Sequence, residues 1–303
     1  MFFGAFVSWF QSNGLALDSA LGLNMNCPAY DSYVERHLTV GSQGFDGDCT
    51  AFYTTVNPKK IKKFCEVINK WYKQHSKSHC ESDDRARLTI IEDIIHSKEV
   101  VLQIIFEADG LNPSGHFLTT VLNIFCVQVD DRCVFLESIP RQVSQNLIEQ
   151  NNLDAKEGQV FVTAVGKLLI EKETPVWVSY PGLSLYNKEV VLTALGDDKI
   201  VTVSNRVALF FNFNTTKKIL NDVGIGYTSA QKEKEGTVIA DVRPFEDLEF
   251  LGQKTAPMGD VVVGVNWVSR TRIPSLAKSV RYVRNTVPLT EATISNCQDT
   301  LTR

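Results

Sequence analysis

The chain has 303 residues, of which 44% are hydrophobic, 22% charged and 10% aromatic. This is the composition of a globular protein with a sizeable core, and it excludes disordered, collagen-like and coiled-coil proteins. Lys and Arg total 31 against 35 Asp and Glu, a net charge of −4, so contact with nucleic acid requires a local cleft rather than a basic surface.

The seven cysteines include no Cys-x-x-Cys pair, which argues against a zinc ribbon or a disulfide framework and favours a reducing compartment. The apolar start at residues 1–10 lacks the basic end and the cleavage site of a signal peptide, and it predicts a buried helix end. No apolar stretch reaches the ~20 residues of a membrane-spanning helix.

Hydrophobic periodicity and turn residues predict short strands mixed with helices. In chain order they indicate a strand at His37–Ser42, a turn at Gly44–Asp48, a helix from Asn57-Pro58, a helix at Asp84–His96, a buried strand at Val101–Glu107, a helix at Leu118–Gln128, strands at Val160–Val165 and Val176–Tyr180, a hairpin of Val190–Ala194 and Ile200–Val203, a helix at Thr215–Val223, a hairpin of Leu248–Leu251 and Val261–Val265, and helices at Ser275–Asn285 and Thr290–Thr300. This order predicts an α+β fold with an antiparallel sheet.

The sharpest local signal is Leu195-Gly196-Asp197-Asp198, which stands between two β runs. Two adjacent carboxylates on a tight hairpin repel each other unless a cation is near, and Mg²⁺ prefers one or two carboxylates plus phosphate oxygens. Gly and Asp are also ordinary residues of a solvated β-turn, so these residues alone leave a plain turn as the alternative.

A second signal is the stretch from Gly110 to Asn123, in which a Pro-Ser-Gly loop leads directly into an apolar helix. The N–H groups at such a helix start attract anions. Thr119 and Asn123 are four residues apart and therefore share one helix face. A simple cap at Ser114 and a backbone contact at Asn123 are the structural alternatives.

Together these segments resemble the palm of viral RNA-dependent RNA polymerases of the picorna-like group, with the dicistroviruses and iflaviruses. The resemblance covers about residues 1–265, and five segments follow the family's motif order. They are Phe45-Asp46-Gly47 for motif A, Pro113-Ser114-Gly115 with Thr119 and Asn123 for motif B, Gly196-Asp197-Asp198 for motif C, Tyr227–Lys232 for motif D and Phe250–Gln253 for motif E.

The resemblance implies RNA-templated RNA synthesis by nucleotidyl transfer, with Mg²⁺ or Mn²⁺ as the cofactor. Asp197 and, to a lesser degree, Asp198 would bind the two ions that activate the primer 3′-hydroxyl and steady the leaving pyrophosphate. Lys232 would protonate the pyrophosphate, although a plain exposed lysine is an equal alternative for this residue.

The resemblance also implies how the ribose is recognised. Asp46 and Asn123 would hydrogen-bond the 2′-hydroxyl that distinguishes a ribonucleotide from a deoxyribonucleotide. Ser114 and Thr119 would support this contact, and Gly115 would let the loop flex.

One departure from the family pattern bears on catalysis. The family has a metal-binding Asp five residues before the position of Asp46, and this chain has Gly41 there. On this alignment the metal site lacks a principal carboxylate, and Asp48 is expected to point elsewhere. The alternative function is therefore a catalytically impaired, polymerase-like module that binds RNA or a partner, and a third is an unrelated α+β binding domain.

The resemblance implies a division of the chain into three parts. Residues 1–36 would end the fingers, residues 37–265 would form the palm with an insertion or extended lobe at 129–189, and residues 266–303 would begin a helical thumb. The expected partners are RNA template and primer, nucleoside triphosphates, and the missing fingers and remaining thumb of the same polyprotein. The expected location is the host cytoplasm, at viral replication complexes.

Two further clusters have simpler interpretations. His75, His79 and Cys80 are close enough in sequence for a metal site, but no fourth ligand is evident, and a solvated loop is the favoured interpretation. The lysines at 59–63 are typical of a solvated helix face more often than of a phosphate contact.

Overall fold

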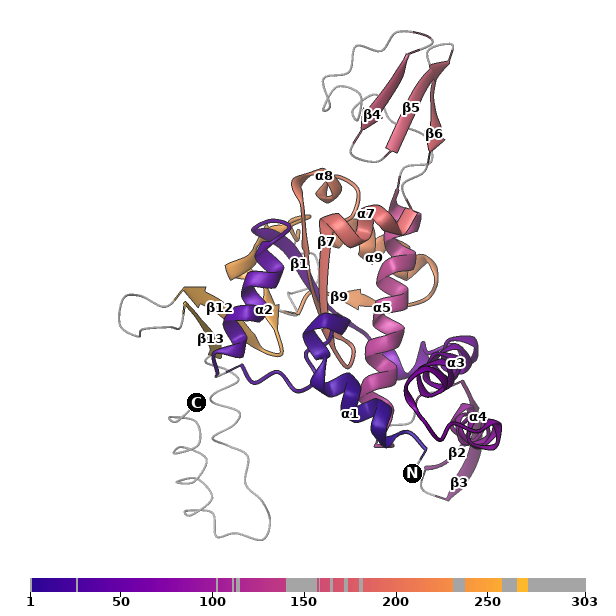
Figure 1. The fold of residues 1–303 in the computed structure, drawn as a ribbon. Helices are drawn as coiled ribbons and strands as arrows, with labels where there is room; N and C mark the ends of the chain where they lie inside the picture. The colour runs from indigo at the N-terminus through magenta and orange to yellow at the C-terminus, as the bar shows by residue number, and fades with distance from the viewer. Residues whose placement is uncertain are drawn as a thin grey trace, which may run out of the picture.

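The computed structural model describes residues 2–25, 27–101, 103–110, 112, 115–139, 157, 159–163, 166–171, 174–179, 182–230, 238–257 and 266–271. A five-stranded antiparallel sheet lies at its centre, in the order β10-β1-β8-β7, with β9 paired to the end of β1 (Figure 1). Its strands are β1 Gln43–Cys49, β7 Val190–Leu195, β8 Asp198–Val203, β9 Tyr227–Thr228 and β10 Arg243–Pro244. The mixed helices and antiparallel sheets confirm the predicted α+β class.

Each face of this sheet has its own hydrophobic core. α5 (Thr119–Ser138) runs beside β7 (Figure 1) and, with α9 (Phe213–Asp222), covers one face. α2 (Ala29–Leu38) and the small sheet β11–β13 cover the other face. Because alternate strand residues point to opposite sides, Val201 packs in the first core and Ile200 in the second.

One helix begins, and another ends, where the sequence predicts. The side chain of Asn57 caps α3 (Pro58–His75) by accepting a hydrogen bond from the Lys59 N–H at 2.8 Å. The end of α9 is followed by Gly224 at φ 82°, in the left-handed region that glycine tolerates. Helical spacing also predicts Val67 on the buried face of α3, but Val67 is 41% exposed.

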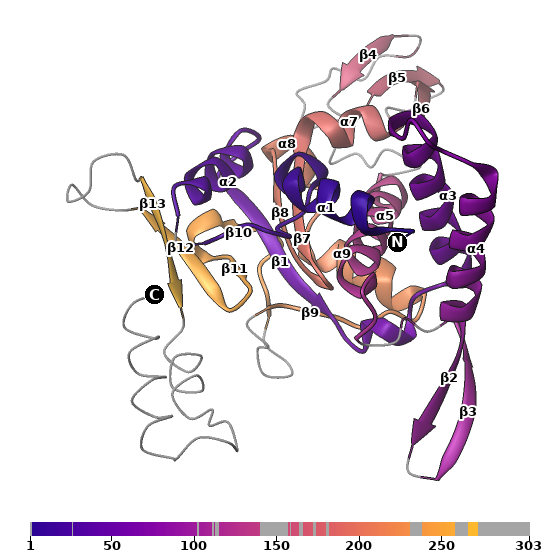
Figure 2. The same ribbon diagram turned by 60° about the horizontal axis from the view of Figure 1, so that its bottom comes forward.

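The region after α4 (Glu81–Ile95) differs from the prediction. The single buried strand expected at Val101–Glu107 is a hairpin of β2 (His96–Val101) and β3 (Ile104–Asp109). Figure 2 shows this hairpin extending away from the end of α4, and Ile105 is 68% exposed. An apolar run does not by itself distinguish a buried strand from an exposed ribbon.

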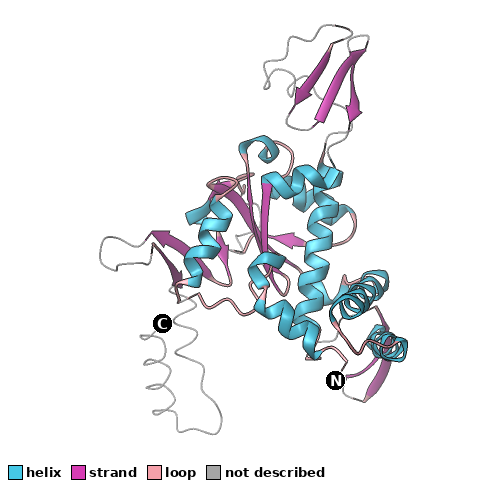
Figure 3. Ribbon diagram, viewed as in Figure 1, coloured by secondary structure: helices cyan, strands magenta, loops and turns pink. Residues whose placement is uncertain are grey.

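The stretch between α5 and β7 contains a sheet of its own. α5 continues to Ser138, ten residues beyond its predicted end at Gln128. β4 (Val160–Thr163), β5 (Gly166–Glu171) and β6 (Thr174–Ser179) pair only with one another and stand apart from the central sheet (Figure 3). α7 (Gly182–Glu189) then leads back into β7.

The largest error of the sequence prediction concerns β1. The strand expected at His37–Ser42 begins in the last turn of α2, and the turn expected at Gly44–Asp48 is strand β1 itself. A Cβ atom on Gly44 would lie 2.0 Å from the Val201 carbonyl oxygen, so this glycine allows two backbones to approach closely. The glycines therefore mark tight packing in a central strand, although they read as a turn in sequence.

The elements near the C-terminus form the second small sheet. β11 (Glu249–Phe250) pairs with β12 (Gln253–Pro257) and not with the predicted segment Val261–Val265, which lies outside the described residues, as do both predicted closing helices. β12 in turn pairs with β13 (Trp267–Thr271). The remaining short elements are α1 Gly4–Ser12, α8 Asn205–Ala208 and the 3-10 helices Gly14–Leu17, Phe52–Thr54 and Phe245–Asp247. Among the described helices, none combines the length and apolar character needed to cross a bilayer.

Candidate active site

The β7–β8 hairpin presents two acidic residues at its tip, as the sequence predicts. The strands pair from Val190↔Val203 to Leu195↔Asp198, which leaves Gly196 and Asp197 as a two-residue turn. Gly196 has φ 66°, and such hairpin turns favour glycine at a positive φ.

This turn opens onto an acidic pocket of about 280 Å³. The pocket is lined by Asp48, Asp197, Asp198, Ala230, Glu249, Leu251 and Gly252. Four carboxylates around one small volume make the local electrostatic potential strongly negative, and their like charges repel one another at this short range. A cation offsets this repulsion, and carboxylate oxygens are the ligands that Mg²⁺ and Mn²⁺ prefer.

Asp48 is the residue that the sequence analysis missed. β1 and β8 are in register at Gly47↔Lys199, so the next step along each strand brings Asp48 to Asp198. The expectation that Asp48 points elsewhere is wrong, since both residues line the pocket. Asp48 faces the same side of β1 as Asp46, but only the β1–β8 register places it beside the acidic turn, so the sequence pattern alone could not select it.

Asp46 is not part of the pocket lining. Its side chain is fully buried, and its Oδ2 accepts a hydrogen bond from the Glu249 N–H at 2.7 Å. Its Oδ1 accepts from the Ala230 N–H at 3.2 Å and from Arg243 Nη2 at 2.7 Å. Both carboxylate oxygens therefore hold neighbouring segments in place, which corrects the expectation that Asp46 is placed to hydrogen-bond the 2′-hydroxyl of a nucleotide.

Gly41 lies at the far end of the hairpin from the acidic turn. A Cβ atom on Gly41 would stand 2.9 Å from the carbonyl oxygen of Val203, which is five residues after Asp198 along β8. A carboxylate at this position would not reach the turn, so the alignment of Gly41 with a metal-binding position is wrong. The site retains an acid on β1, and it is Asp48.

The start of α5 carries the predicted residues Thr119 and Asn123. Thr119 is the first residue of the helix, and its hydroxyl donates to the His116 carbonyl oxygen at 2.8 Å. Asn123 Oδ1 accepts a hydrogen bond from Asn112 Nδ2, and Asn123 is not among the residues that line the acidic pocket. Gly115 has φ 96°, and no atom lies within 4 Å of the place where a Cβ would stand, while Ser114 lies outside the described residues.

Asn112, a second residue that the sequence analysis missed, connects α5 to the end of β1. It is 1% exposed, and its N–H donates to the Tyr53 carbonyl oxygen at 3.2 Å. Its side-chain amide donates to Asn123 and accepts from His116 Nε2 at 2.6 Å. Tyr53, five residues after Asp48, is thereby held close to Asn123. Nothing in the local sequence pattern distinguishes Asn112 from an ordinary loop asparagine.

The neutral form of His116 fits this network. Its Nδ1 accepts a hydrogen bond from the Leu118 N–H at 3.2 Å, so the proton of the neutral ring is assigned to Nε2, which donates to Asn112. Burial lowers the pKa of His116 because the charged ring loses solvation. The loop is therefore held by a histidine that stays neutral at physiological pH.

The remaining predicted residues fall in three places. Tyr227 and Thr228 form β9 beside β1, and Ala230 reaches the pocket, but Lys232 lies outside the described residues. In the segment expected as motif E, Leu251 at φ 54° and Gly252 at φ 73° turn the chain between β11 and β12 and line the pocket.

His75 ends α3, and His79 and Cys80 lie in the loop that leads into α4. His79 Nε2 contacts Asp84 Oδ2 at 2.8 Å, and His75 Nδ1 contacts the Trp71 carbonyl oxygen at 2.9 Å. Within the described residues, no group of three or more His, Cys, Asp or Glu side chains is arranged to hold a metal ion by itself.

A cation in the acidic pocket would therefore draw further oxygen ligands from water or substrate.

Comparisons with known proteins agree with this architecture. A family model described as viral RNA-dependent RNA polymerase matches residues 1–299. The replicase polyprotein of Acute bee paralysis virus (strain Rothamsted) is 22% identical over 301 residues, 99% of this chain and 14% of that polyprotein. The genome polyprotein of Rice tungro spherical virus (strain A) is 23% identical over 247 residues, 82% of this chain and 6% of that polyprotein.

A solved structure shares the fold. The Sicinivirus 3Dpol RNA dependent RNA polymerase superimposes with a TM-score of 0.67 at 14% identity, and the match covers 100% of this chain and 54% of that one. The chain thus spans about half of the solved structure and a small part of the polyproteins that it matches.

Proposed function

Because the chain belongs to the viral RNA-dependent RNA polymerase family, we propose that it supplies the palm of an enzyme that copies RNA into RNA. The observation that carries this proposal is the acidic pocket in which Asp48 on β1 meets Asp197 and Asp198 on the β7–β8 turn. Two strands far apart in the sequence converge there, which a plain solvated turn does not require.

Divalent cations fit the donor set of this pocket. Asp48 and Asp197 would hold Mg²⁺ or Mn²⁺, with Asp198 beside them, and phosphate oxygens and water would complete the ligand shell. The bound ions would lower the pKa of the attacking 3′-hydroxyl and stabilise the leaving pyrophosphate. The chain's own contribution is to place the carboxylates on two adjacent strands, so that their positions are fixed before substrate binds.

Ribose recognition would lie beside this pocket, at the junction of β1 and α5. In the family pattern the ribose-contacting acid follows the metal-binding Asp by five residues. Counted from Asp48, this position is Tyr53, which the Asn112 bridge holds near Asn123. We therefore assign the ribose contact to Asn123, supported by Thr119 and Ser114, and place Tyr53 where the family has an acid.

The remaining roles follow from the family. Lys232 would protonate the leaving pyrophosphate, and Gly115 would give its loop freedom to adjust. RNA template, RNA primer and nucleoside triphosphates are the proposed ligands, and the fingers and the rest of the thumb would come from the same polyprotein. The proposed site of action is a replication complex in the host cytoplasm. The alternative of an impaired module rests on Gly41, and the placement of Asp48 in the acidic pocket favours an active polymerase instead, in which Asp48 would supply the acid on β1.

Template-dependent nucleotide incorporation by the replicase that carries this chain tests the proposal. Asp48→Asn and Asp197→Asn should each abolish incorporation, because each removes a carboxylate from the pocket. Asp222→Asn, at the exposed end of α9, removes the same charge elsewhere and should leave the rate unchanged. Full incorporation by Asp48→Asn would refute the assignment.

A further inference from the structure

A buried ion pair lies directly beneath the acidic turn. Lys199 follows Asp198 on β8 and therefore faces the opposite side of the sheet, where its Nζ donates to Asp131 Oδ1 of α5 at 2.6 Å. The Lys199 and Asp131 side chains are 4% and 0% exposed. Tyr186 Oη donates to Asp131 Oδ2 at 2.8 Å, so both oxygens of this carboxylate are bonded.

The neighbouring strand β7 is also held in place by hydrogen bonds, at the residue that pairs with Lys199. Ala194 of β7 is the Cα partner of Lys199. Its N–H donates to the Asp18 carbonyl oxygen at 3.0 Å, and its own carbonyl oxygen accepts from the Ala20 N–H at 2.9 Å. The last residue pair before Leu195 is therefore anchored on both strands of the hairpin.

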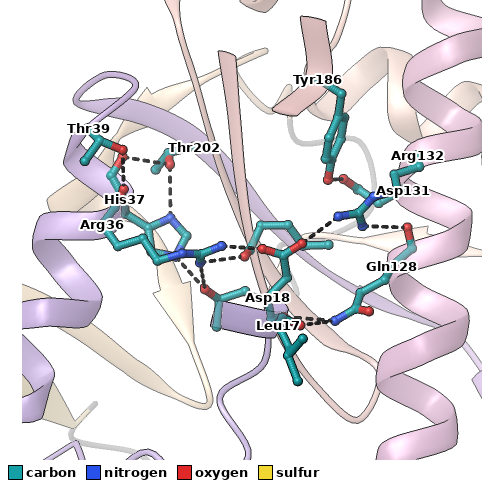
Figure 4. A network of polar contacts seen from close by, with 12 residues as sticks. Leu17, Asp18, Arg36, His37, Thr39, Gln128, Asp131, Arg132, Tyr186 and Thr202 are labelled. Carbon is teal, nitrogen blue, oxygen red and sulfur yellow. Dashed lines mark hydrogen bonds and ion pairs between the residues drawn. The ribbon is translucent and has the colours of Figure 1, made fainter. Parts of the chain in front are cut away.

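Both anchors lead to the same stretch of α5. Figure 4 shows the Asp18 carboxylate between the guanidinium groups of Arg36 and Arg132. Arg132 Nη2 donates to Asp18 Oδ2 at 2.7 Å, and its guanidinium lies 4.9 Å from the centre of the Tyr186 ring. Since Arg132 adjoins Asp131 on α5, this helix holds the base of the turn through two neighbouring residues.

Stability alone does not account for the buried pair. Removing two charges from water costs about as much as their attraction returns, and well-packed apolar side chains of the same size stabilise such a position equally well or better. What the pair adds is a fixed geometry. Because Tyr186 occupies one oxygen of the Asp131 carboxylate, the other oxygen accepts Lys199 in a defined position. The pair lies one residue from Asp198, where geometry matters most to the pocket.

We propose that Asp131 and Lys199 are positioning residues for the acidic turn: they hold Asp197 and Asp198 at a set place relative to α5 and so determine how tightly the pocket binds a divalent cation. Neither side chain lines the pocket. The inference rests on the proposed function only for the identity of the pocket as a cation site. α5 also carries Asn123, so one helix would place both the turn and the ribose contact.

The test replaces the pair without leaving a buried charge. A triple variant, Lys199→Met/Asp131→Leu/Tyr186→Phe, removes the pair together with the hydroxyl that would lose its acceptor. The matched control is Lys60→Met/Asp130→Leu, which removes an ion pair between α3 and the residue of α5 next to Asp131. Measured for each are the melting temperature, the hydrogen exchange of amides 195–199, and the calorimetric affinity for Mn²⁺ alone.

The triple variant should melt near the wild-type temperature while its turn amides exchange faster. Its Mn²⁺ affinity should fall about 10-fold to 100-fold, as for other residues that orient metal ligands without contacting the metal. The control should match the wild type in the exchange of the turn amides and in Mn²⁺ affinity. A purely structural pair would move the melting temperature and leave the affinity of the folded protein unchanged.

Other outcomes are equally decisive. Wild-type exchange and Mn²⁺ affinity in the triple variant would overturn the positioning role. If wild type and Asp197→Asn bind Mn²⁺ equally weakly, the proposed function fails, and the exchange rates alone then decide the positioning role. Should the triple variant not fold, Lys199→Met/Asp131→Asn removes the ion pair and keeps an amide oxygen as the acceptor for Tyr186. Unchanged exchange at residues 195–199 in that variant would refute the inference.

Discussion

Asp46 and Arg243 form an ion pair with an N–O distance of 2.7 Å, in which the carboxylate is fully buried and the guanidinium is 14% exposed. The same carboxylate accepts the N–H groups of Ala230 and Glu249, two residues that line the acidic pocket. One aspartate thus ties three segments to β1, two residues before Asp48.

The first prediction compares these two aspartates. Asp46→Leu leaves Arg243 without its partner and two buried N–H groups without an acceptor, so it should lower the free energy of unfolding by about 3–5 kcal/mol. Asp48→Leu should change stability little or raise it, because it relieves repulsion in the pocket, but it should abolish Mn²⁺ binding. Urea unfolding and calorimetry measure the two effects. Equal stability losses in both variants would contradict these separate roles.

The second prediction concerns Gly41. Gly41→Asp should not tighten Mn²⁺ binding, because position 41 lies at the far end of β8 from Asp197. Its Cβ would stand 2.9 Å from the Val203 carbonyl oxygen, so the substitution should destabilise the fold by roughly 1–3 kcal/mol. Calorimetric titration of wild type and variant measures the first effect. Tighter binding in Gly41→Asp would restore the alignment of position 41 with the metal site.

The third prediction concerns sugar selection. If Tyr53 stands at the ribose-contacting position, Tyr53→Asp should raise the preference for ribonucleotides over deoxyribonucleotides by about 10-fold, the effect of one hydrogen bond worth about 1.4 kcal/mol. The measurement is the ratio of the two incorporation efficiencies in the replicase. Asp46→Asn should leave this ratio unchanged in the enzyme that remains folded. A change with Asp46→Asn and none with Tyr53→Asp would reverse the assignment.

The fourth prediction concerns pH. His37 is fully buried, and desolvation, followed by the nearby Arg36 guanidinium, lowers its pKa well below the ordinary value of 6.5. Thr202 Oγ1 donates to the His37 carbonyl oxygen and so accepts from the ring Nδ1–H, while Nε2 accepts from Thr193. The folded ring is thus neutral.

Acidification should therefore destabilise the protein. Well above pH 6.5 the ring is neutral in both the folded and the unfolded state, so His37 makes the free energy of unfolding independent of pH there. Below that pH the unfolded chain binds a proton that the folded chain excludes, so the free energy of unfolding falls by up to about 1.4 kcal/mol per pH unit for this residue. His116 contributes with the same sign. His37→Phe should be less stable at pH 8 but lose less between pH 6.5 and 5, and an equal loss in urea unfolding would contradict the assignment.

Local chemistry made several features predictable from the sequence. A helix start at Asn57-Pro58 depends on one side chain and one N–H, and the hairpin turn at Gly196 depends on the φ of one residue. The order of the motifs identified the family. The helix start, the turn and each single motif depend on residues close together in the chain, so the information needed for each is contained in a short stretch.

The pocket itself was decided by tertiary structure. The strand that carries Asp48 reads as a turn, because its glycines serve the close approach of β8 and Tyr227, which lie more than 150 residues away in sequence. Only the β1–β8 register shows that Asp48 and not Asp46 meets the acidic turn. A single step along a strand reverses the face of every side chain, and the partner strand sets that step. The sequence by itself determined which residues are acidic, and the packing of β1 against β8 decided which of them share a pocket.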